Sequence, residues 1–216
     1  IGYCRLAEPA ALVWAANLAS IELHAPMARA VDIDVPTMVV FDLDPGPGTG
    51  VAECAEVALW IRDVLDGIGL ACFPKTSGSK GLQVYVPLNS PTDEPADEPP
   101  THERASAFAL TVAQVLEAAH PTLIVTTMAK AARTGKVLID WSQNSRHKTT
   151  VCAYSLRARP RPTVSTPVDW AEVEAAAAGE DPLVFEAADV LDRVAERGDL
   201  FAPTLVEVQR LPGASK

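Results

Sequence analysis

The sequence predicts an α/β (α+β) fold, and two observations support this. Short segments rich in Val, Ile and Phe alternate with longer segments whose apolar residues recur every three or four positions. A strand, a Gly-rich turn and a helix follow one another directly over residues 37–69. No run of about eighteen uncharged apolar residues is present, so the sequence predicts no membrane-spanning helix.

The predicted strand within residues 37–50 ends in two acids. Asp42 and Asp44 lie two positions apart, and side chains alternate along a strand, so both carboxylates project from one face at about 7 Å spacing. Carboxylate oxygens are the ligands that Mg²⁺ and Mn²⁺ prefer, so the pair outlines a metal site. The alternative is two acids that open a turn rich in Pro and Gly.

The elements beside this strand are predicted from composition and periodicity. Residues 10–21 are rich in Ala and Leu and predict a short helix leading to His24, followed by a connection over residues 25–36. After the Gly/Pro turn, apolar residues recur from Val51 onward at helical spacing, and the helix is predicted to end near Gly67.

Residues 76–81 (Thr-Ser-Gly-Ser-Lys-Gly) lie between two predicted strands, 70–75 and 82–88. Small residues let backbone N–H groups approach an anion, while Ser hydroxyls and Lys80 can donate to phosphate oxygens. The spacing is not that of a Walker A loop, and an ordinary hairpin turn is the alternative. The acidic, Pro-rich residues 89–101 predict a surface loop.

The second half of the chain repeats the theme of a strand that ends in an acid. Residues 137–141 predict a buried strand carrying Asp140 at its tip. Further elements are predicted as helices at 106–119, 166–179 and 186–196 and as strands at 123–127 and 149–155, with a fraying tail from residue 203.

The net charge of −10 argues against a nucleic-acid binder, but the charge is unevenly distributed. Basic residues concentrate in one segment whose only acid is Asp140, which predicts a local basic face toward an anion, or else a solvated basic surface. The basic residues are Lys130, Arg133, Lys136, Arg146, Lys148, Arg157, Arg159 and Arg161. The four cysteines have no Cys-x-x-Cys spacing, so reduced thiols are expected.

Four motifs in this order resemble the polymerase domain of bacterial DNA ligase D, within the archaeo-eukaryotic primase superfamily. The motifs are Phe-Asp-Leu-Asp-Pro-Gly from Phe41, Thr-Ser-Gly-Ser-Lys-Gly-Leu from Thr76, Gly-Lys-Val-Leu-Ile-Asp-Trp-Ser-Gln-Asn from Gly135, and the stretch from Lys148 to Arg157. The resemblance implies a primase-type core, with a mixed and mostly antiparallel sheet flanked by helices. It also implies that residues 1–216 form one primase-polymerase domain that lacks an N-terminal segment.

The implied activity is that of a DNA-dependent, polymerase-type nucleotidyltransferase. It would add NTPs, with ribonucleotides preferred, to a DNA primer 3′-OH by a two-metal mechanism in DNA repair such as non-homologous end joining. The implied cofactors are two Mn²⁺ or Mg²⁺ ions. The implied partners are primer-template or gapped DNA, NTP or dNTP, Ku and a DNA ligase, with no membrane, and the implied location is the bacterial cytoplasm at the nucleoid.

The resemblance also assigns site residues. Asp42, Asp44 and Asp140 match the metal-binding triad, and His24 matches a His beside the metals, so we expect these side chains to converge. The residues matched to the incoming nucleotide are Ser77, Lys80, Arg133, Gln143 and Arg157, together with Gln83, where the family commonly has His.

Two alternatives stay open at this level. The first is a catalytically weak or silent nucleic-acid or nucleotide-binding module, favoured by Gln83 but disfavoured by the retention of three acids. The second is a haloacid-dehalogenase-like phosphatase with Asp42 as nucleophile and Asp44 as acid/base. That class expects Gly-Thr directly after Asp-x-Asp, whereas this chain has Pro-Gly.

Overall fold

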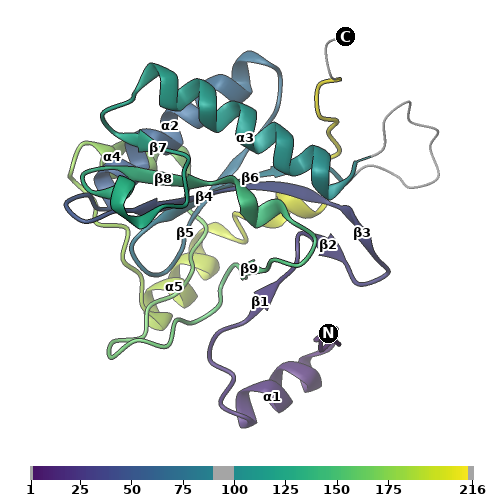
Figure 1. The fold of residues 1–216 in the computed structure, drawn as a ribbon. Helices are drawn as coiled ribbons and strands as arrows, with labels where there is room; N and C mark the ends of the chain where they lie inside the picture. Colours follow the sequence, from purple (N-terminus) through teal and green to yellow (C-terminus); the bar gives the residue numbers. More distant parts are fainter. Residues whose placement is uncertain (1, 90–99, 214–216) are drawn as a thin grey trace.

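A five-stranded sheet with the order β5-β6-β4-β8-β7 forms the centre of the protein (Figure 1). The computed structural model describes residues 2–89 and 100–213. The β7–β8 pair is parallel and the other pairs of this sheet are antiparallel, so the predicted mixed and mostly antiparallel sheet is confirmed. The strands are β4 (Met38–Pro45), β5 (Phe73–Thr76), β6 (Leu82–Pro87), β7 (Ile124–Val125) and β8 (Val137–Asp140).

Two helices cover one face of this sheet, α2 (Val51–Gly67) and α3 (His102–Ala119) (Figure 1). Their buried side chains form the main core with alternate residues of β4, namely Val39, Phe41 and Leu43. Because side chains alternate along a strand, Val40, Asp42 and Asp44 face the other way. The core therefore occupies one face of β4 and the acids occupy the opposite face.

Local capping fixes where the helices begin. Glu53 Oε2 accepts a hydrogen bond from Gly50 N at 2.7 Å, which satisfies a backbone donor at the start of α2. Helix α4 (Trp170–Ala177) begins after Asp169, which forms a reciprocal capping box with Glu172. The predicted start near residue 166 is therefore too early, because Thr166 is buried and bonded to the backbone and hydroxyl of Thr76.

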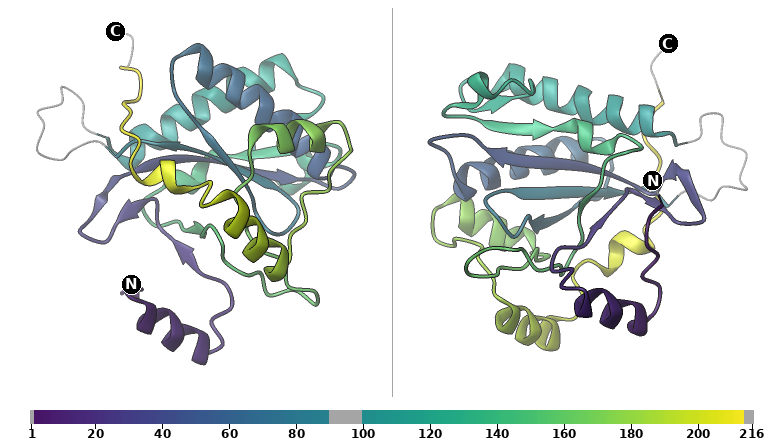
Figure 2. Two further views of the ribbon diagram at one scale, coloured as in Figure 1. Left: turned by 180° about the vertical axis from the view of Figure 1, so that it is seen from behind. Right: turned by 60° about the horizontal axis from the view of Figure 1, so that its bottom comes forward.

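Segments from both ends of the chain lie on the side of the acids (Figures 1 and 2). Strand β1 (His24–Ala25) pairs with β9 (Thr150–Val151), which joins residues more than a hundred positions apart. The remaining elements are β2 (Ala28–Arg29), β3 (Asp32–Pro36), α5 (Ala187–Arg197), the short 3₁₀ helices η1 (Lys130–Arg133), η2 (Trp141–Asn144) and η3 (Ala202–Leu205), and α1 (Pro9–Asn17).

Several expected elements differ from those observed. Residues 25–36 contain β2, β3 and part of β1 instead of a plain connection. Strands β1 and β2 have two residues each, too few to show alternation, whereas Ile33 and Val35 do alternate with acids in β3. The strand expected over 149–155 is limited to β9, since the chain turns at Tyr154, where φ is +65°. As far as residue 213, where the description ends, the tail makes contacts instead of fraying: Thr204 is fully buried and Gln209 N donates to Leu88 O.

Other expectations concern the surface of the protein. The loop predicted over residues 89–101 lies largely outside the described residues. Within residues 2–89 and 100–213, no helix is long and apolar enough to cross a membrane. All four cysteines, which fall in the described part of the chain, are free thiols. Helix α1 stands apart from the sheet, and Ala15 is its buried residue (Figure 2).

Candidate active site

A row of four polar side chains crosses the sheet at one register. Asp42 on β4 pairs with Gln83 on β6 and with Asp140 on β8, and Gln83 pairs in turn with Lys75 on β5. Directly opposed residues of antiparallel strands project from the same face, about 5 Å apart. Lys75, Gln83, Asp42 and Asp140 therefore stand side by side on the face away from the main core.

The acids on this face repel one another. Asp42 is 9% exposed, and its burial together with the neighbouring Asp44 raises its pKa to about 7. The pKa of Asp44 is also raised, first by burial and then by Asp140, while Arg133 partly offsets the shift. Gln83 Nε2 donates to Asp42 Oδ1 at 3.0 Å and favours the carboxylate form of Asp42.

Asp140 is held by donors from its own end of β8. Its Oδ1 accepts from Ser142 N at 2.9 Å and from Ser142 Oγ at 2.6 Å. Its Oδ2 accepts from Gln143 Nε2 at 3.3 Å and lies 3.7 Å from Lys148 Nζ. The side chain is thus fixed by neighbours while its Cα stays directly opposite that of Asp42.

The donor set suits a divalent cation. Asp42, Asp44 and Asp140 share one face of the sheet. Burial first, and neighbouring carboxylates second, raise the pKa values of Asp42 and Asp44, and a bound cation would favour their ionised forms. Among the described residues, however, no three His, Cys, Asp or Glu side chains are close enough together to form a ready metal-binding group. Asp42 and Asp140 are opposed in register, whereas the Asp140 carboxylate is directed to its own donors. The expected convergence of the three carboxylates with His24 therefore stays a prediction.

Asn144 links this end of β8 to the central strand. Its Oδ1 accepts from Val40 N at 2.8 Å and its Nδ2 donates to Val40 O at 2.8 Å. Strand β8 ends at Asp140. Beyond that point the side-chain amide of Asn144 takes the place of the β8 backbone and continues the hydrogen bonds to β4. This holds η2, and with it Gln143, against the central strand.

The loop between β5 and β6 forms one wall of the site. Ser77 Oγ accepts from Ser79 N and Gly81 N at 3.2 and 3.1 Å, while Lys80 is exposed. Later residues hold the loop from outside: Arg157 Nη1 donates to Ser77 O at 2.6 Å, and Thr163 Oγ1 donates to Gly78 O. The loop is thus a hairpin turn, as one reading of the sequence had it, and it also lines the cavity described below.

Two glycines allow close backbone approach at the site. A Cβ on Gly81 would lie 1.9 Å from Leu43 O, and a Cβ on Gly46 would lie 1.8 Å from Arg133 O. Both distances are far below van der Waals contact, so any side chain would push these segments apart. Gly81 thereby keeps the loop of Lys80 against β4, and Gly46 keeps the Arg133 turn beside Asp44.

His24 and Arg157 meet at a shared carboxylate. Glu22 Oε2 lies 3.1 Å from His24 Nε2, and Glu22 Oε1 lies 3.2 Å from Arg157 Nε. Glu22 also accepts from Ala158 N at 2.9 Å. The hydrogen bond with His24 and that with Ala158 lower the pKa of Glu22 to about 2. Glu22 therefore stays ionised near neutral pH and fixes both partners.

These side chains surround one cavity of about 350 Å³. Acids from β4 lie on one side, and cationic groups from other elements complete the lining. Every predicted site residue except Asp140 lines it: His24, Asp42, Asp44, Ser77, Lys80, Gln83, Arg133, Gln143 and Arg157. Asp140 does not line the cavity, although its Cα lies opposite that of Asp42. A cavity with both carboxylates and cations suits a polyanion that is bound together with divalent cations.

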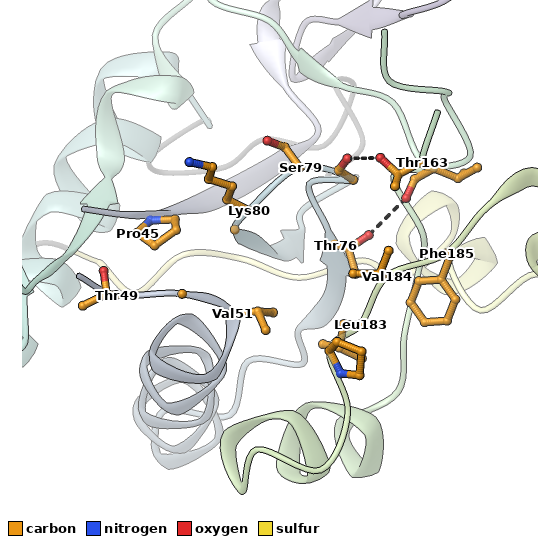
Figure 3. A pocket seen from close by; sticks show the side chains of 15 residues that line it. Pro45, Thr49, Val51, Thr76, Ser79, Lys80, Thr163, Leu183, Val184 and Phe185 are labelled. Atoms are coloured by element: carbon orange, nitrogen blue, oxygen red, sulfur yellow. Dashed lines mark hydrogen bonds between the residues drawn. The ribbon is translucent and has the colours of Figure 1, made fainter. Parts of the chain in front are cut away.

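A second cavity of about 380 Å³ lies behind the loop (Figure 3). It shares Pro45, Ser79, Lys80 and Gly81 with the first cavity. Its other walls are mainly apolar and come from the start of α2 and from residues 182–185. The loop is therefore a partition between a charged cavity and an apolar one.

Three residues of the site were not assigned from the sequence: Glu22, Lys75 and Asn144. Glu22 and Asn144 act through contacts with residues more than a hundred positions away, for which the sequence carries no signal. Lys75 could have been found, because a hairpin closing around residues 77–81 places it directly opposite Gln83. Once a hairpin turn is predicted here, the length of the turn fixes which residues of its two strands lie opposite each other.

Comparison with known proteins points to one family. Residues 1–201 match the model of the LigD primase-polymerase domain. The chain is 43% identical over 224 residues to the multifunctional non-homologous end joining DNA repair protein LigD of Mycobacterium tuberculosis, covering 95% of this chain and 28% of that protein. It is 45% identical over 198 residues to the LigD protein of Mycolicibacterium smegmatis, covering 89% and 24%.

A solved structure gives the same result. The polymerase domain from Mycobacterium tuberculosis ligase D, in complex with DNA, superposes with a TM-score of 0.79 at 43% identity. The match covers 92% of this chain and 68% of that one. The chain spans about a quarter of the length of the two LigD relatives, 28% and 24%.

Proposed function

Since this chain belongs to the LigD primase-polymerase domain family, we propose that it is a nucleotidyltransferase that extends a DNA primer in break repair. The substrates are an NTP, with ribonucleotides preferred over dNTPs, and the 3′-OH of a primer on gapped or broken DNA. This assignment replaces the phosphatase alternative, because the family is a polymerase family.

One observation carries the proposal: acids and cations line a single cavity from opposite elements. Asp42 and Asp44 come from the tip of β4, while Lys80, Arg133 and Arg157 come from three other segments. The cationic side chains can bind the phosphate oxygens of a triphosphate. The acids must lie near its α-phosphorus, where the primer 3′-oxygen attacks. A cavity of about 350 Å³ lies within the usual range for small-ligand sites.

Asp42, Asp44 and Asp140 would hold two divalent cations, Mn²⁺ or Mg²⁺. When bound, such ions neutralise triphosphate charge and lower the pKa of a coordinated hydroxyl. Carboxylates supply the hard oxygen ligands that these ions require. Gln83 and Gln143 support the ligands, since each donates a hydrogen bond to one of the acids.

The residues of the chain position the substrates. Lys80 and Arg157 bind phosphate oxygens, with the Arg157 fork held by Glu22 and by Ser77 O. His24, held by the same Glu22, faces the cavity as a hydrogen-bond partner. The 3′-oxygen attacks the α-phosphorus as the bond to the β-phosphate oxygen breaks, so pyrophosphate leaves and the hydroxyl proton passes to solvent.

The DNA and partner assignments rest on the relatives. One solved relative is a complex with DNA, and the relatives are named for non-homologous end joining. We infer that the basic segment around residues 130–161 faces the DNA backbone, and that end joining with Ku and a DNA ligase at the bacterial nucleoid is the setting.

The test is extension of a labelled primer on gapped DNA with Mn²⁺ or Mg²⁺ and with each NTP or dNTP. We expect extension by the parent, faster with NTPs, and none when Asp42→Ala and Asp44→Ala are combined. If the parent binds Mn²⁺ and NTP but does not extend the primer, it is the silent binding module that the sequence left open. Binding of neither would overturn the proposal.

A further inference from the structure

Lys75 is a lysine with no access to solvent. Its relative exposure is 0%, and no other lysine or arginine in the described part of the chain is in the buried class. A buried ammonium is costly unless it is hydrogen-bonded. Nζ donates to Gln83 Oε1 and to Ser165 Oγ, each at 2.6 Å, and reaches Thr76 O at 3.5 Å. Burial lowers the pKa of Lys75 to about 7, and the nearby Asp42 opposes this shift. In the protonated form, each of the three hydrogen-bond donors of Nζ has a partner.

These contacts fix the orientation of the Gln83 amide. Oε1 accepts from Lys75 Nζ at 2.6 Å and from Tyr85 Oη at 3.0 Å, which directs Nε2 toward Asp42 Oδ1 at 3.0 Å. The reverse orientation would place the NH₂ group against the ammonium and the amide oxygen against the carboxylate. Both contacts would be repulsive, so Lys75 selects the one rotamer in which Gln83 donates to Asp42.

Lys75 is itself held in place from two sides. Ser165 Oγ, which accepts from Nζ, donates to Thr76 O at 2.9 Å and so ties β5 to a segment ninety residues later. The ring of Tyr85 lies beside the ammonium, with 5.5 Å from Nζ to the ring centroid. Nζ of Lys75 is thus held in the row from two sides, and the Gln83 amide links it to the Asp42 carboxylate.

We propose that Lys75 is a positioning residue for the metal-binding carboxylate Asp42, acting through Gln83. This inference rests on the proposed function. Gln83 supplies the hydrogen-bond donor to Asp42, and Lys75 holds the Gln83 amide from one strand further out. Together they orient the Asp42 carboxylate.

The experiment measures Mn²⁺ affinity of the purified chain by the EPR signal of free Mn²⁺, which does not depend on activity. Lys75→Met removes the ammonium but keeps an unbranched apolar stem of similar size. Gln83→Met breaks the link, and the double variant removes both. Arg62→Met is the matched control, because Arg62 lies on α2 and pairs with Glu174 away from the site.

We expect Lys75→Met to weaken Mn²⁺ binding roughly tenfold, as substitutions of residues that orient metal ligands do. We expect Gln83→Met to have a similar effect and the double variant to be no weaker than Gln83→Met alone, since Lys75 acts through Gln83. In primer extension, Lys75→Met should lower the kcat, while its KM for NTP stays near that of the parent. A merely structural lysine would lower the Tm without moving the affinity.

Three outcomes would overturn the inference: parent-like affinity in folded Lys75→Met, effects that add in the double variant, or a loss in Arg62→Met of equal size. Should Lys75→Met fail to fold, Ser165→Ala removes one anchor of the ammonium, and parent-like Mn²⁺ affinity there would overturn the proposal. A parent that binds no Mn²⁺ would overturn both this inference and the metal site of the proposed function.

Discussion

Asp42 and Asp140 stand directly opposite each other on neighbouring antiparallel strands, both nearly buried. Like charges in this cross-strand position are destabilising. The protein keeps two carboxylates where a core would ordinarily place apolar pairs, so this part of the sheet is less stable than its packing allows.

Asp42→Asn should stabilise the metal-free protein at neutral and alkaline pH. The pKa of Asp42 is raised from 3.8 to about 7, so the folded state binds a proton more tightly than the unfolded state. Protonation of Asp42 therefore contributes to the free energy of unfolding. This contribution is fully present below about pH 4 and is lost as the pH rises through 7. Asparagine removes this loss, and we expect a gain on the order of 2 kcal/mol at pH 8.

The measurement is urea unfolding in EDTA at pH 5 and pH 8. Asp63→Asn, an exposed position on α2, serves as control and should change the free energy of unfolding little. An Asp42→Asn protein less stable than the parent at pH 8 would contradict this interpretation.

Mn²⁺ affinity should depend on pH. A cation competes with the proton on Asp42, whose pKa is about 7, so affinity should rise by roughly tenfold per pH unit between pH 5 and 6.5. It should level off above pH 7.5. Calorimetric titration at several pH values checks this, and an affinity that is constant from pH 5 to pH 8 would show that Asp42 is not a ligand.

Glu22→Gln should weaken nucleotide binding. The neutral amide loses the ion pair that holds Arg157 and the charge beside His24. Ion pairs of this partly exposed kind contribute up to about 1 kcal/mol, so the KM for NTP should rise by roughly twofold to fivefold. Steady-state primer extension measures it, with exposed Glu56→Gln as control. An unchanged KM would mean that Arg157 is held well enough by Ser77 O.

Gly81→Ala should displace the loop that carries Lys80. The new methyl group would lie 1.9 Å from Leu43 O, a backbone atom that cannot give way without moving β4. We expect a loss on the order of 2 kcal/mol in stability and a marked loss of NTP affinity. Gly50→Ala is the matched control, because its Cβ meets nothing closer than 3.7 Å. Equal effects of the two substitutions would contradict the close-approach argument.

Asn144→Leu should loosen the end of β8. Leucine fills a similar volume but leaves Val40 N and Val40 O without their partners, at a cost of about 1 to 3 kcal/mol for each buried group. Hydrogen exchange at the Val40 amide should accelerate relative to that at Phe41. If the Val40 amide stays protected, another group must take over the ladder.

The sequence predicted the centre of the site better than its surroundings. The strands of Asp42 and of Asp140 are short continuous apolar runs and helix α2 has clear helical periodicity, and all three form close to the predicted bounds. Asp44 and Asp42 share a face because they are two residues apart on one strand, a local fact. Their relation to Asp140 depends on strand order, which the resemblance to a known family supplied.

The missed parts depend on contacts between distant segments. Strand β1 has two residues and exists because β9 lies beside it. Lys75 resembles a surface lysine in the sequence, and only Ser165 and Gln83 make its burial possible. No local pattern encodes either fact.

The loop of residues 76–81 depends on a segment that the chain reaches late. Hydrogen bonds join Ser155, Ser165 and Arg157 to residues 23, 75 and 77, across separations of 132, 90 and 80 positions. Closing such large loops costs entropy before the contacts compensate for it, which slows folding. During synthesis, the apolar strands β4 and β6 therefore emerge well before the segment that completes the acidic face. The cavity should be among the last regions to gain protection in a refolding experiment.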